Sequence, residues 1–592
     1  MIMNVETKNC QNCKKDFTIE PEDFDFYEKM KVPAPTFCSQ CRFQRRLMFM
    51  NERALYKRAC DMCKKRVVGM YADEKKDITV YCNSCWWSDK WGGDEYAREY
   101  DPARPFFEQL NELIRHTPQM ALAINHPTLV NSEYVNHVAT AKNSYLIYTA
   151  DYCENVLYSE ILLRSKDSMD CTISNDSELC YELINSGRSY RTFFSEDCDS
   201  CTDVYFSKDC IGCSDCFGCT NLRKKKYHIF NKPYTKEAYQ EELKKFMVDS
   251  YHGIQDILAM ARNAWLAYPR KFTNELMNTN VTGEYIYESR NSRDMYIVHK
   301  GAEDCRYCQI LTMPTIKDAY DYTIWGNSAQ RIYECMVVGE GADTVKFSYQ
   351  TWPNVQDLEY CVHTLSSSHM FGCANIRNKK YCILNKEYSP EEYLELKKRI
   401  IKDMVERPFI SKTGANYSYG EFLPPDLSLF AYNESYAMQF FPMGREGVER
   451  SGLDWYDAPQ NPHRPTIRAD ALPDSIKDVS DSIISEIIEC GICKKPFRIV
   501  PAELTLLRNF ILPLPRACPN CRSLERWSRA NPPHLWKRTC QCYGAQSSSG
   551  IYQNTATHAH GTEPCKVEFE TSYAPERPEI VYCEQCYNTE VA

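Results

Sequence analysis

The sequence of 592 residues contains no stretch of about 18 apolar residues, and its first eight residues show no apolar segment behind a basic start. We therefore expect a soluble, cytoplasmic protein with no membrane partner. Common catalytic motifs are also missing: no G-x-S-x-G, P-loop, H-E-x-x-H or dinucleotide fingerprint occurs, and the deaminase pattern of a zinc ligand, one residue and Glu is not matched. No small-molecule substrate is indicated.

The chain also has no excess of basic residues. Lys and Arg total 71 against 80 Asp and Glu, which gives a formal net charge of −9. Each Zn²⁺ held by four thiolates adds a charge of −2, so four such sites would bring the total to about −17. An acidic total argues against indiscriminate coating of nucleic acid, although local basic patches can persist.

Cysteine, in contrast, is abundant, with 32 residues. Disulfides are rare in a reducing compartment, so metal ligation or simple burial must account for these thiols. A cysteine framework recurs at the two ends of the chain at a constant offset of 480 residues. Cys10, Cys13, Cys38, Cys41 and Cys60 become Cys490, Cys493, Cys518, Cys521 and Cys540. One folding unit built on C-x-x-C pairs is therefore used twice.

Three zinc sites follow directly from this framework. Zn²⁺ prefers four thiolates in a tetrahedron, and a C-x-x-C turn presents two sulfurs to one ion. Two such turns separated by 24 residues complete a site at each end, and a second pair of turns follows in the N-terminal copy. The predicted ligand sets are Cys10, Cys13, Cys38 and Cys41; Cys60, Cys63, Cys82 and Cys85; and Cys490, Cys493, Cys518 and Cys521.

The fourth site departs from the pattern. Its first turn is a C-x-C, one residue short, and the partner pair comes 40 residues later. We favour one site of four thiolates, which makes about four Zn²⁺ in total: Cys540, Cys542, Cys583 and Cys586. Three more candidate ligands lie in the insert: His558, His560 and Cys565. They leave open a second metal, a catalytic zinc with a bound water, or histidines in an exposed loop.

The terminal segments resemble the treble-clef zinc-ribbon domain found in many bacterial proteins. The matching residues are Cys10-x-x-Cys13, Phe17, Phe26-Tyr27, Pro35 and Cys38-x-x-Cys41-Arg42. The whole chain resembles a family of large cysteine-rich proteins of candidate-phyla bacteria, some of which carry a CaiB/BaiF-type CoA-transferase label. The resemblance implies zinc modules at both ends, and the label implies CoA transfer. The sequence itself has no glycine loop that would cradle a nucleotide.

The centre of the chain contains a second duplication. Residues 217–234 recur at 371–388 with an offset of 154. Upstream of each copy, short strand-like pieces bounded by Asn, Asp, Ser and Gly follow one another every 10 to 13 residues, which favours a parallel β-solenoid. A many-stranded antiparallel sandwich is the alternative, but few Asn-Gly or Asp-Gly turns occur. A helix follows each copy, and Ser389 to Glu392 form a capping box for the second.

One central motif approximates the cysteine run of bacterial ferredoxins: Cys210, Cys213, Cys216 and Cys219. The last gap is short, no Pro follows, and the second copy has Thr364, Ser367, Met370 and Cys373 at these positions. We expect a ladder of buried cysteines rather than an Fe–S cluster. The same interpretation covers Cys153, Cys171, Cys180, Cys198, Cys201, Cys305, Cys308, Cys335, Cys361 and Cys382.

These patterns predict a mainly β protein with helical caps, in which a duplicated parallel β-solenoid-like centre is flanked by treble-clef or zinc-ribbon modules. The predicted domains are an N-terminal tandem zinc-binding module (1–100), a helical linker (101–130), a first solenoid repeat with a helical cap (131–280), a second one (281–405), a Pro-rich connector with little core of its own (406–488), and a C-terminal tandem zinc-binding module (489–592).

Two classes of function remain. Zinc sites with four thiolates have no open position, which favours a non-catalytic scaffold or binding protein with a protein or RNA partner. Six basic residues could contact phosphate on RNA or the ribosome: Arg42, Arg45, Arg46, Arg53, Lys57 and Arg58. Alternatively, these residues form a solvated helix face that neutralises the thiolates. The second class is a zinc enzyme centred on the C-terminal Cys/His cluster.

Overall fold

The computed structural model describes residues 5–459 and 463–591 and divides the chain into two compact units. Unit 1 consists of residues 1–123 and 275–457, and unit 2 of residues 124–274 and 458–592. Each unit therefore combines one terminal cysteine module with the solenoid that is more distant from it in the sequence. No helix in the described ranges is long and apolar enough to cross a membrane.

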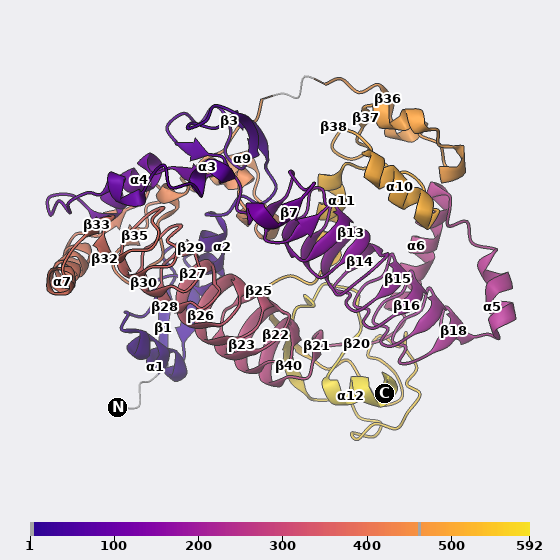
Figure 1. Cartoon of the computed structure of the whole chain (residues 1–592). Helices are drawn as coiled ribbons and strands as arrows, with labels where there is room; N and C mark the ends of the chain where they lie inside the picture. Colours follow the sequence, from indigo (N-terminus) through magenta and orange to yellow (C-terminus); the bar gives the residue numbers. More distant parts are fainter. Residues whose placement is uncertain (1–4, 460–462, 592) are drawn as a thin grey trace. The chain divides into compact units, whose positions relative to one another are not determined.

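The solenoid of unit 2 confirms the parallel β-solenoid predicted for the first repeat (Figure 1). Its strands include β13 (Lys166–Asn175), β14 (Tyr181–Ile184), β15 (Tyr190–Phe193), β16 (Thr202–Tyr205), β17 (Ser214–Phe217) and β18 (Lys226–Ile229). They pair in parallel with a register of 12 residues, as in Thr202 with Ser214 and Ser214 with Lys226. This pairing rules out the antiparallel sandwich. A terminal hairpin with β19 (Lys232–Pro233) and the helices α5 (Lys236–Leu243) and α6 (Tyr251–Leu266) follow.

A three-residue rhythm underlies each 12-residue turn. Every third residue has a left-handed backbone, for example Asp197, Ser200 and Asp203 with φ between 53° and 55°. The residue directly after it points inward: Cys198 and Cys201 are fully buried. Asp, Asn and Ser are frequent at the left-handed positions because their short polar side chains tolerate this conformation better than most. The inward positions are narrow and favour small or soft side chains.

The solenoid of unit 1 has slightly larger turns. Its longest strands are β22 (Thr279–Tyr287), β23 (Arg290–Val298), β26 (Ile316–Gly326) and β27 (Ala329–Gly339). The parallel register is 13 residues between Ile316 and Ala329 and falls to 12 at the end, where β31 (Ser368–Phe371) pairs with β32 (Lys380–Ile383). Helix α7 (Pro390–Glu406) then begins with the predicted capping box, in which the Ser389 hydroxyl accepts from the Glu392 amide.

The two cysteine modules have similar elements in the same order. The N-terminal module contains β1 (Glu6–Asn9), β2 (Asp16–Ile19), α1 (Pro21–Met30), α2 (Ser39–Leu47), β3 (Tyr56–Ala59), β4 (Arg66–Gly69), β5 (Val80–Tyr81) and α3 (Asn83–Trp86). The C-terminal module contains β37 (Ile488–Glu489), β38 (Pro496–Phe497), α10 (Pro501–Phe510), α11 (Pro519–Arg529), β39 (Trp536–Thr539), β40 (Glu568–Thr571), β41 (Val581–Tyr582) and α12 (Glu584–Val591).

Helices of both modules pack directly on the solenoid of the same unit. In unit 1, α2 lies against β26 and β27. In unit 2, α11 and α10 lie against β13. Helix α4 (Phe106–His116), in the segment predicted as a helical linker, also joins unit 1, where Phe106 packs on Tyr360 and Phe371 of the solenoid. The modules are therefore anchored to the solenoids by buried side chains.

The segment predicted as a Pro-rich connector contributes to both units. Residues 406–457 belong to unit 1, where Phe422, Leu423 and Leu427 are almost completely buried. The remaining part belongs to unit 2, where Ile476 and Ile483 join an apolar cluster with α6 and α10. Its secondary structure is short and irregular, with 3-10 turns such as Pro425–Leu427 and Asp481–Ser485. The segment covers the modules rather than forming a separate core.

Candidate metal centres

Three groups of four cysteines come together as the spacing predicts. In each group all four sulfurs lie within 4.8 Å of one another, and the groups are Cys10, Cys13, Cys38 and Cys41; Cys60, Cys63, Cys82 and Cys85; and Cys490, Cys493, Cys518 and Cys521. Sulfur pairs across the two turns are 3.8, 3.9 and 3.7 Å apart in the three groups. A tetrahedron with metal–sulfur bonds of about 2.3 Å has edges of about 3.8 Å. The sulfurs are therefore spaced for one tetrahedral ion each.

The local backbone of these clusters prepares the sulfurs for a cation. The amide of Cys38 donates to Cys10 Sγ at 3.3 Å, and the amide of Cys518 donates to Cys490 Sγ at 3.2 Å. Cys38 and Cys518 are also the N-caps of α2 and α11, where the helix dipole favours negative charge. Hydrogen bonds from backbone amides stabilise the negative charge of a thiolate.

The pKa values move in the same direction at the first turns. The amide of Lys65 is the main reason why the pKa of Cys63 falls to about 7. Burial raises the pKa of Cys490, but amides of Cys518 and Cys493 outweigh it and lower the value to about 6. At the second turns the shift is opposite: the hydrogen bond with Cys10 raises the pKa of Cys38 to about 11, and burial raises the pKa of Cys518 to about 11. Because metal binding requires deprotonated thiols, a cation is needed to complete the deprotonation of each site.

The fourth cluster has a different composition from the predicted one. The structure groups Cys540, Cys565, Cys583 and Cys586, all buried, and places Cys542 in another set. Cys565 Sγ lies 3.9 Å from Cys583 Sγ, and the Cys583 amide donates to Cys540 Sγ at 3.2 Å. The predicted Cys540/Cys542/Cys583/Cys586 set is therefore corrected. A C-x-C turn is one residue too short to direct both of its sulfurs at one ion, as a C-x-x-C turn does. The Cys565 amide donates to the Cys542 carbonyl at 2.9 Å, so the loop that contains Cys565 lies against this turn.

Cys542 instead lies with the two histidines of the insert. Its set is Cys542, His558, His560 and Cys586, whose ligand atoms all lie within 4.8 Å of one another. Cys586 thus belongs to both sets. The predicted extra candidates His558, His560 and Cys565 all lie at this centre, so the alternative of exposed loop histidines is wrong for His558, which is 4% exposed.

The cysteines of the solenoids act as hydrogen-bond donors, whereas those of the modules act as acceptors. Cys198 Sγ donates to the carbonyls of Glu196 at 3.4 Å and Ser207 at 3.6 Å, and Cys180 Sγ donates to Glu178 and Ser189. A thiol that donates to carbonyls is protonated. Burial accordingly raises the pKa of Cys180 to about 12 and that of Cys198 well above its ordinary value. Cys180 and Cys198 are therefore neutral thiols in a ladder inside the solenoid.

The ferredoxin-like run belongs to this ladder. Cys210, Cys213, Cys216 and Cys219 occupy successive inward positions of one 12-residue turn and are at most 1% exposed. Cys213 and Cys219 each donate to two carbonyls, those of Ile211 and Leu222 and those of Phe217 and His228. The run does not belong to any of the metal-capable groups found among the described residues.

Three basic residues predicted to contact RNA are buried inside unit 1. Arg42, Arg45 and Arg46 of α2 are at most 2% exposed, which removes them from the surface and corrects the prediction for them. Arg46 donates to Asp321 at 3.2 Å and to Thr323 at 3.1 Å, while Arg42 lies 2.8 Å from the second oxygen of Asp321. Their positive charge neutralises carboxylates of the solenoid, not phosphate.

Arg45 of the same helix lies between two further carboxylates, 2.9 Å from Glu334 and 3.0 Å from Glu421. Of the other predicted residues, Arg58 is buried and bonded to Asp61, Arg53 is partly buried, and Lys57 is exposed. The acidic partners were not found from the sequence, because nothing in a single acidic residue of a strand indicates that it faces an arginine from a distant segment.

Unit 2 contains the same arrangement with different residues. Arg526 of α11 donates to Asp170 at 2.9 Å and to Thr172 at 3.0 Å, which matches Arg46 with Asp321 and Thr323. Arg529 lies 3.0 Å from Glu196. Burial raises the pKa of Glu196, but Lys208 and Arg529 outweigh it and lower the value to about 2, so this carboxylate is ionised. Both modules thus contact an Asp-x-Thr segment of their solenoid through an arginine.

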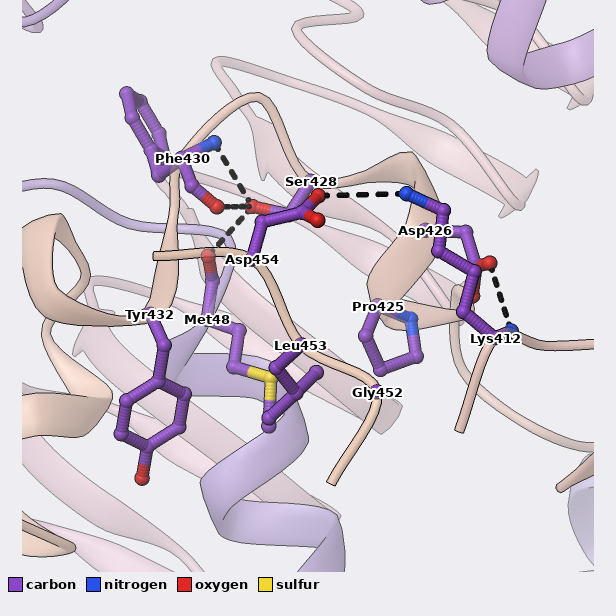
Figure 2. Close-up of a pocket in the computed structure, with 10 residues that line it drawn as sticks. All are labelled: Met48, Lys412, Pro425, Asp426, Ser428, Phe430, Tyr432, Gly452, Leu453 and Asp454. Carbon is purple, nitrogen blue, oxygen red and sulfur yellow. Dashed lines mark hydrogen bonds and ion pairs between the residues drawn. The ribbon is translucent and has the colours of Figure 1, made fainter. Parts of the chain in front are cut away.

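Hollows of different sizes occur among the described residues, and one of about 760 Å³ lies open along the solenoid of unit 1, beside Arg290 and Lys317. A cavity of about 20 Å³, which holds about one water, lies in unit 1 at the end of α2 (Figure 2). The Ser428 hydroxyl beside it donates to the Met48 carbonyl at 2.7 Å, a hydrogen bond drawn as a dashed line in Figure 2. A shallow, open groove of about 400 Å³ lies beside Cys540 and Cys565. Cys540 and Cys565 line this groove, but they are only 3% and 6% exposed.

Comparisons with protein-family models, with curated proteins and with solved structures found no match to this chain.

Proposed function

We propose that this protein is a zinc-dependent, non-catalytic scaffold in which each terminal module clamps one β-solenoid. The observation that carries the proposal is the contrast between two kinds of cysteine. In the modules, sulfurs accept backbone amides, all four sulfurs of a group lie within 4.8 Å of one another, and one pair in each of three groups is 3.7 to 3.9 Å apart, which suits one tetrahedral ion. In the solenoids, sulfurs donate to carbonyls. Seventeen of the 32 cysteines belong to metal-capable groups, and fifteen belong to ladders.

Zinc is the metal that this ligand chemistry favours. Four thiolates at tetrahedral spacing select Zn²⁺ or iron, and a C-x-x-C turn followed by a helix that begins at the second cysteine pair is typical of a treble clef. We accordingly assign the modules to that type. A site filled by four thiolates has no position for water, so the zinc supplies folding free energy rather than catalysis.

The scaffold role is supported by where the arginines lie. α2 and α11 use their cations on carboxylates within their own units, so the folded modules hold the solenoids in place. Zinc binding and solenoid docking are thereby linked, because α2 and α11 start at the ligands Cys38 and Cys518. We propose a protein rather than RNA as the partner, since four of the six cations expected to contact phosphate are buried: Arg42, Arg45, Arg46 and Arg58.

A zinc-dependent enzyme is the second candidate, because histidines and an open groove of about 400 Å³ occur at the C-terminal cluster. It requires a metal with an exchangeable water. The CoA-transferase activity implied by the family label would additionally need a nucleotide site.

The test is removal of zinc from the full chain with a chelator, followed by hydrogen exchange. The scaffold account predicts that exchange rises first in both modules and in strands β13 and β26, which contact α11 and α2, while the remote turns of the solenoids stay protected. Unchanged exchange in the modules after complete chelation would refute it. A second test is a titration with mixed structured RNA at about 0.1 M salt, where the Debye length is about 10 Å. We expect no binding, and tight binding would restore RNA as the proposed partner.

A further inference from the structure

The C-terminal cluster offers more ligands than one zinc ion can use. Two sets of four ligand atoms, each within 4.8 Å of one another, share Cys586 and together contain seven residues: Cys540, Cys565, Cys583, Cys586, Cys542, His558 and His560. Two tetrahedra that share one corner need seven ligands in total. A thiolate can occupy such a corner because its sulfur has lone pairs for two metals.

The histidines are oriented as ligands. His558 is 4% exposed, its Nε2 contacts Glu590 Oε1 at 2.9 Å, and its buried Nδ1 has no hydrogen-bond partner. A buried nitrogen without a partner costs about 1–3 kcal/mol unless something binds it. His560 presents Nε2 to Cys586 Sγ at 3.4 Å and uses Nδ1 for the Glu563 carbonyl. In each ring one nitrogen is fixed by protein, which leaves the other for a metal.

The surrounding residues support this arrangement. Glu590 is held by the Thr555 amide at 2.8 Å and the Tyr552 hydroxyl at 2.9 Å, so it can orient His558 as carboxylates orient zinc-bound histidines. Asn554 donates to Cys542 Sγ at 3.2 Å and accepts from the Tyr582 hydroxyl at 2.8 Å. Cys542 thus receives a hydrogen bond suited to a thiolate.

We propose that the C-terminal module holds a dinuclear zinc centre bridged by the Cys586 thiolate. One ion is bound by Cys540, Cys565, Cys583 and Cys586, and the other by Cys542, His558, His560 and Cys586. Five thiolates and two Zn²⁺ leave a net charge of about −1, compared with about −2 for a single four-thiolate site, which lowers the cost of burial. Both ions are closed by protein ligands. This inference rests on the zinc chemistry of the proposed function and brings the total to five ions per chain.

The first test is the zinc content of the full-length protein and three variants, measured by elemental analysis after removal of loosely bound metal. The proposal predicts five zinc ions in the wild type, four in the double variant His558→Gln/His560→Gln, and three in Cys586→Ser. His252→Gln is the matched control in the same unit, since His252 is exposed and pairs with Asp474 at the surface; it should keep five.

Four zinc ions in both the wild type and the double variant would overturn the proposal but not the scaffold function, whereas wild-type zinc near zero would defeat both. Since Cys586→Ser could lose both ions by unfolding, a second measurement is the zinc X-ray absorption spectrum. A zinc–zinc distance near 3.5–4 Å is expected in the wild type and not in the double histidine variant. Five zinc ions without this distance would overturn the bridge.

Discussion

Arg46 Nη1 lies 3.2 Å from Asp321 Oδ1, and both side chains are completely buried. The equivalent pair of unit 2 is Arg526 and Asp170, 2.9 Å apart and also completely buried. In both units, therefore, an arginine that follows a cysteine of a metal-capable group by five residues pairs with a buried Asp of the solenoid. These pairs connect the metal centres to the solenoids.

Removal of one partner should be costly. Arg526→Ala leaves Asp170 buried without its closest cation, and we expect the free energy of unfolding of unit 2 to fall by about 3–5 kcal/mol. Denaturant unfolding, followed by hydrogen exchange in α11 and β13, measures the change. Lys537→Ala, an exposed cation of the same module, should change it by less than about 0.5 kcal/mol.

A double variant separates the pair from its surroundings. Arg526→Ala combined with Asp170→Ala should cost clearly less than the sum of the single changes, because neither charge is then left alone. Strict additivity would show that the two side chains do not interact.

Ligand and ladder cysteines should respond differently to the same substitution. Cys38→Ser is expected to lose one zinc ion and several kcal/mol of module stability, because a ligand is removed. Cys201→Ser should keep all zinc and lose only ~1–3 kcal/mol, the cost of a hydroxyl in a ladder position. Elemental analysis of both purified variants decides this, and equal zinc loss would refute the division of the cysteines.

The ladder thiols should also resist alkylation. Cys180 and Cys198 are fully buried with raised pKa values, so they offer little thiolate to a reagent. After chelation, mass spectrometry should find iodoacetamide first on the seventeen cysteines of the metal-capable groups. Labelling of Cys180 or Cys198 at the same rate as Cys10 would contradict the account.

His363 gives the solenoid of unit 1 a pH dependence. Burial lowers its pKa from 6.5 to about 4, although a hydrogen bond with Asn375 raises it slightly. The unfolded chain therefore binds the proton more readily between these values, and the stability present above pH 6.5 is lost as the pH falls toward 4.

His363→Gln should flatten this slope, as measured by denaturant unfolding between pH 7 and pH 4. Zinc release in acid affects wild type and variant alike, so the difference between them isolates the histidine. His369→Gln, at a half-buried position beside Asp357, is the control and should retain the slope. An unchanged slope in His363→Gln would contradict the interpretation.

The solenoid could be predicted from the sequence because the length of its turns follows from a short, local sequence repeat. Asp, Asn and Ser at left-handed positions and small side chains after them repeat every three residues, as Asp197-Cys198 and Ser200-Cys201 illustrate. The same rhythm explains the ferredoxin-like spacing of Cys210 to Cys219, since an inward position recurs every third residue. Three of the four metal-capable clusters were predictable for a similar reason, since the two cysteines of each C-x-x-C pair are close in the sequence.

The remaining features depend on contacts between distant segments. No periodicity indicates that Arg46 will meet Asp321, 275 residues away, or that residues 1–123 join residues 275–457. The fourth cluster was predicted incorrectly because the spacing of Cys542 resembles that of a shortened ligand pair, while the insert between Cys542 and Cys583 supplies Cys565 from a loop. Tertiary packing decides between such ligand sets.

The most direct test of the central claim is the metal content and first coordination shell of the purified full-length protein. The account predicts at least four zinc ions per chain, with a shell dominated by sulfur at about 2.3 Å. Fewer than two zinc ions per chain, or appreciable iron, would contradict it.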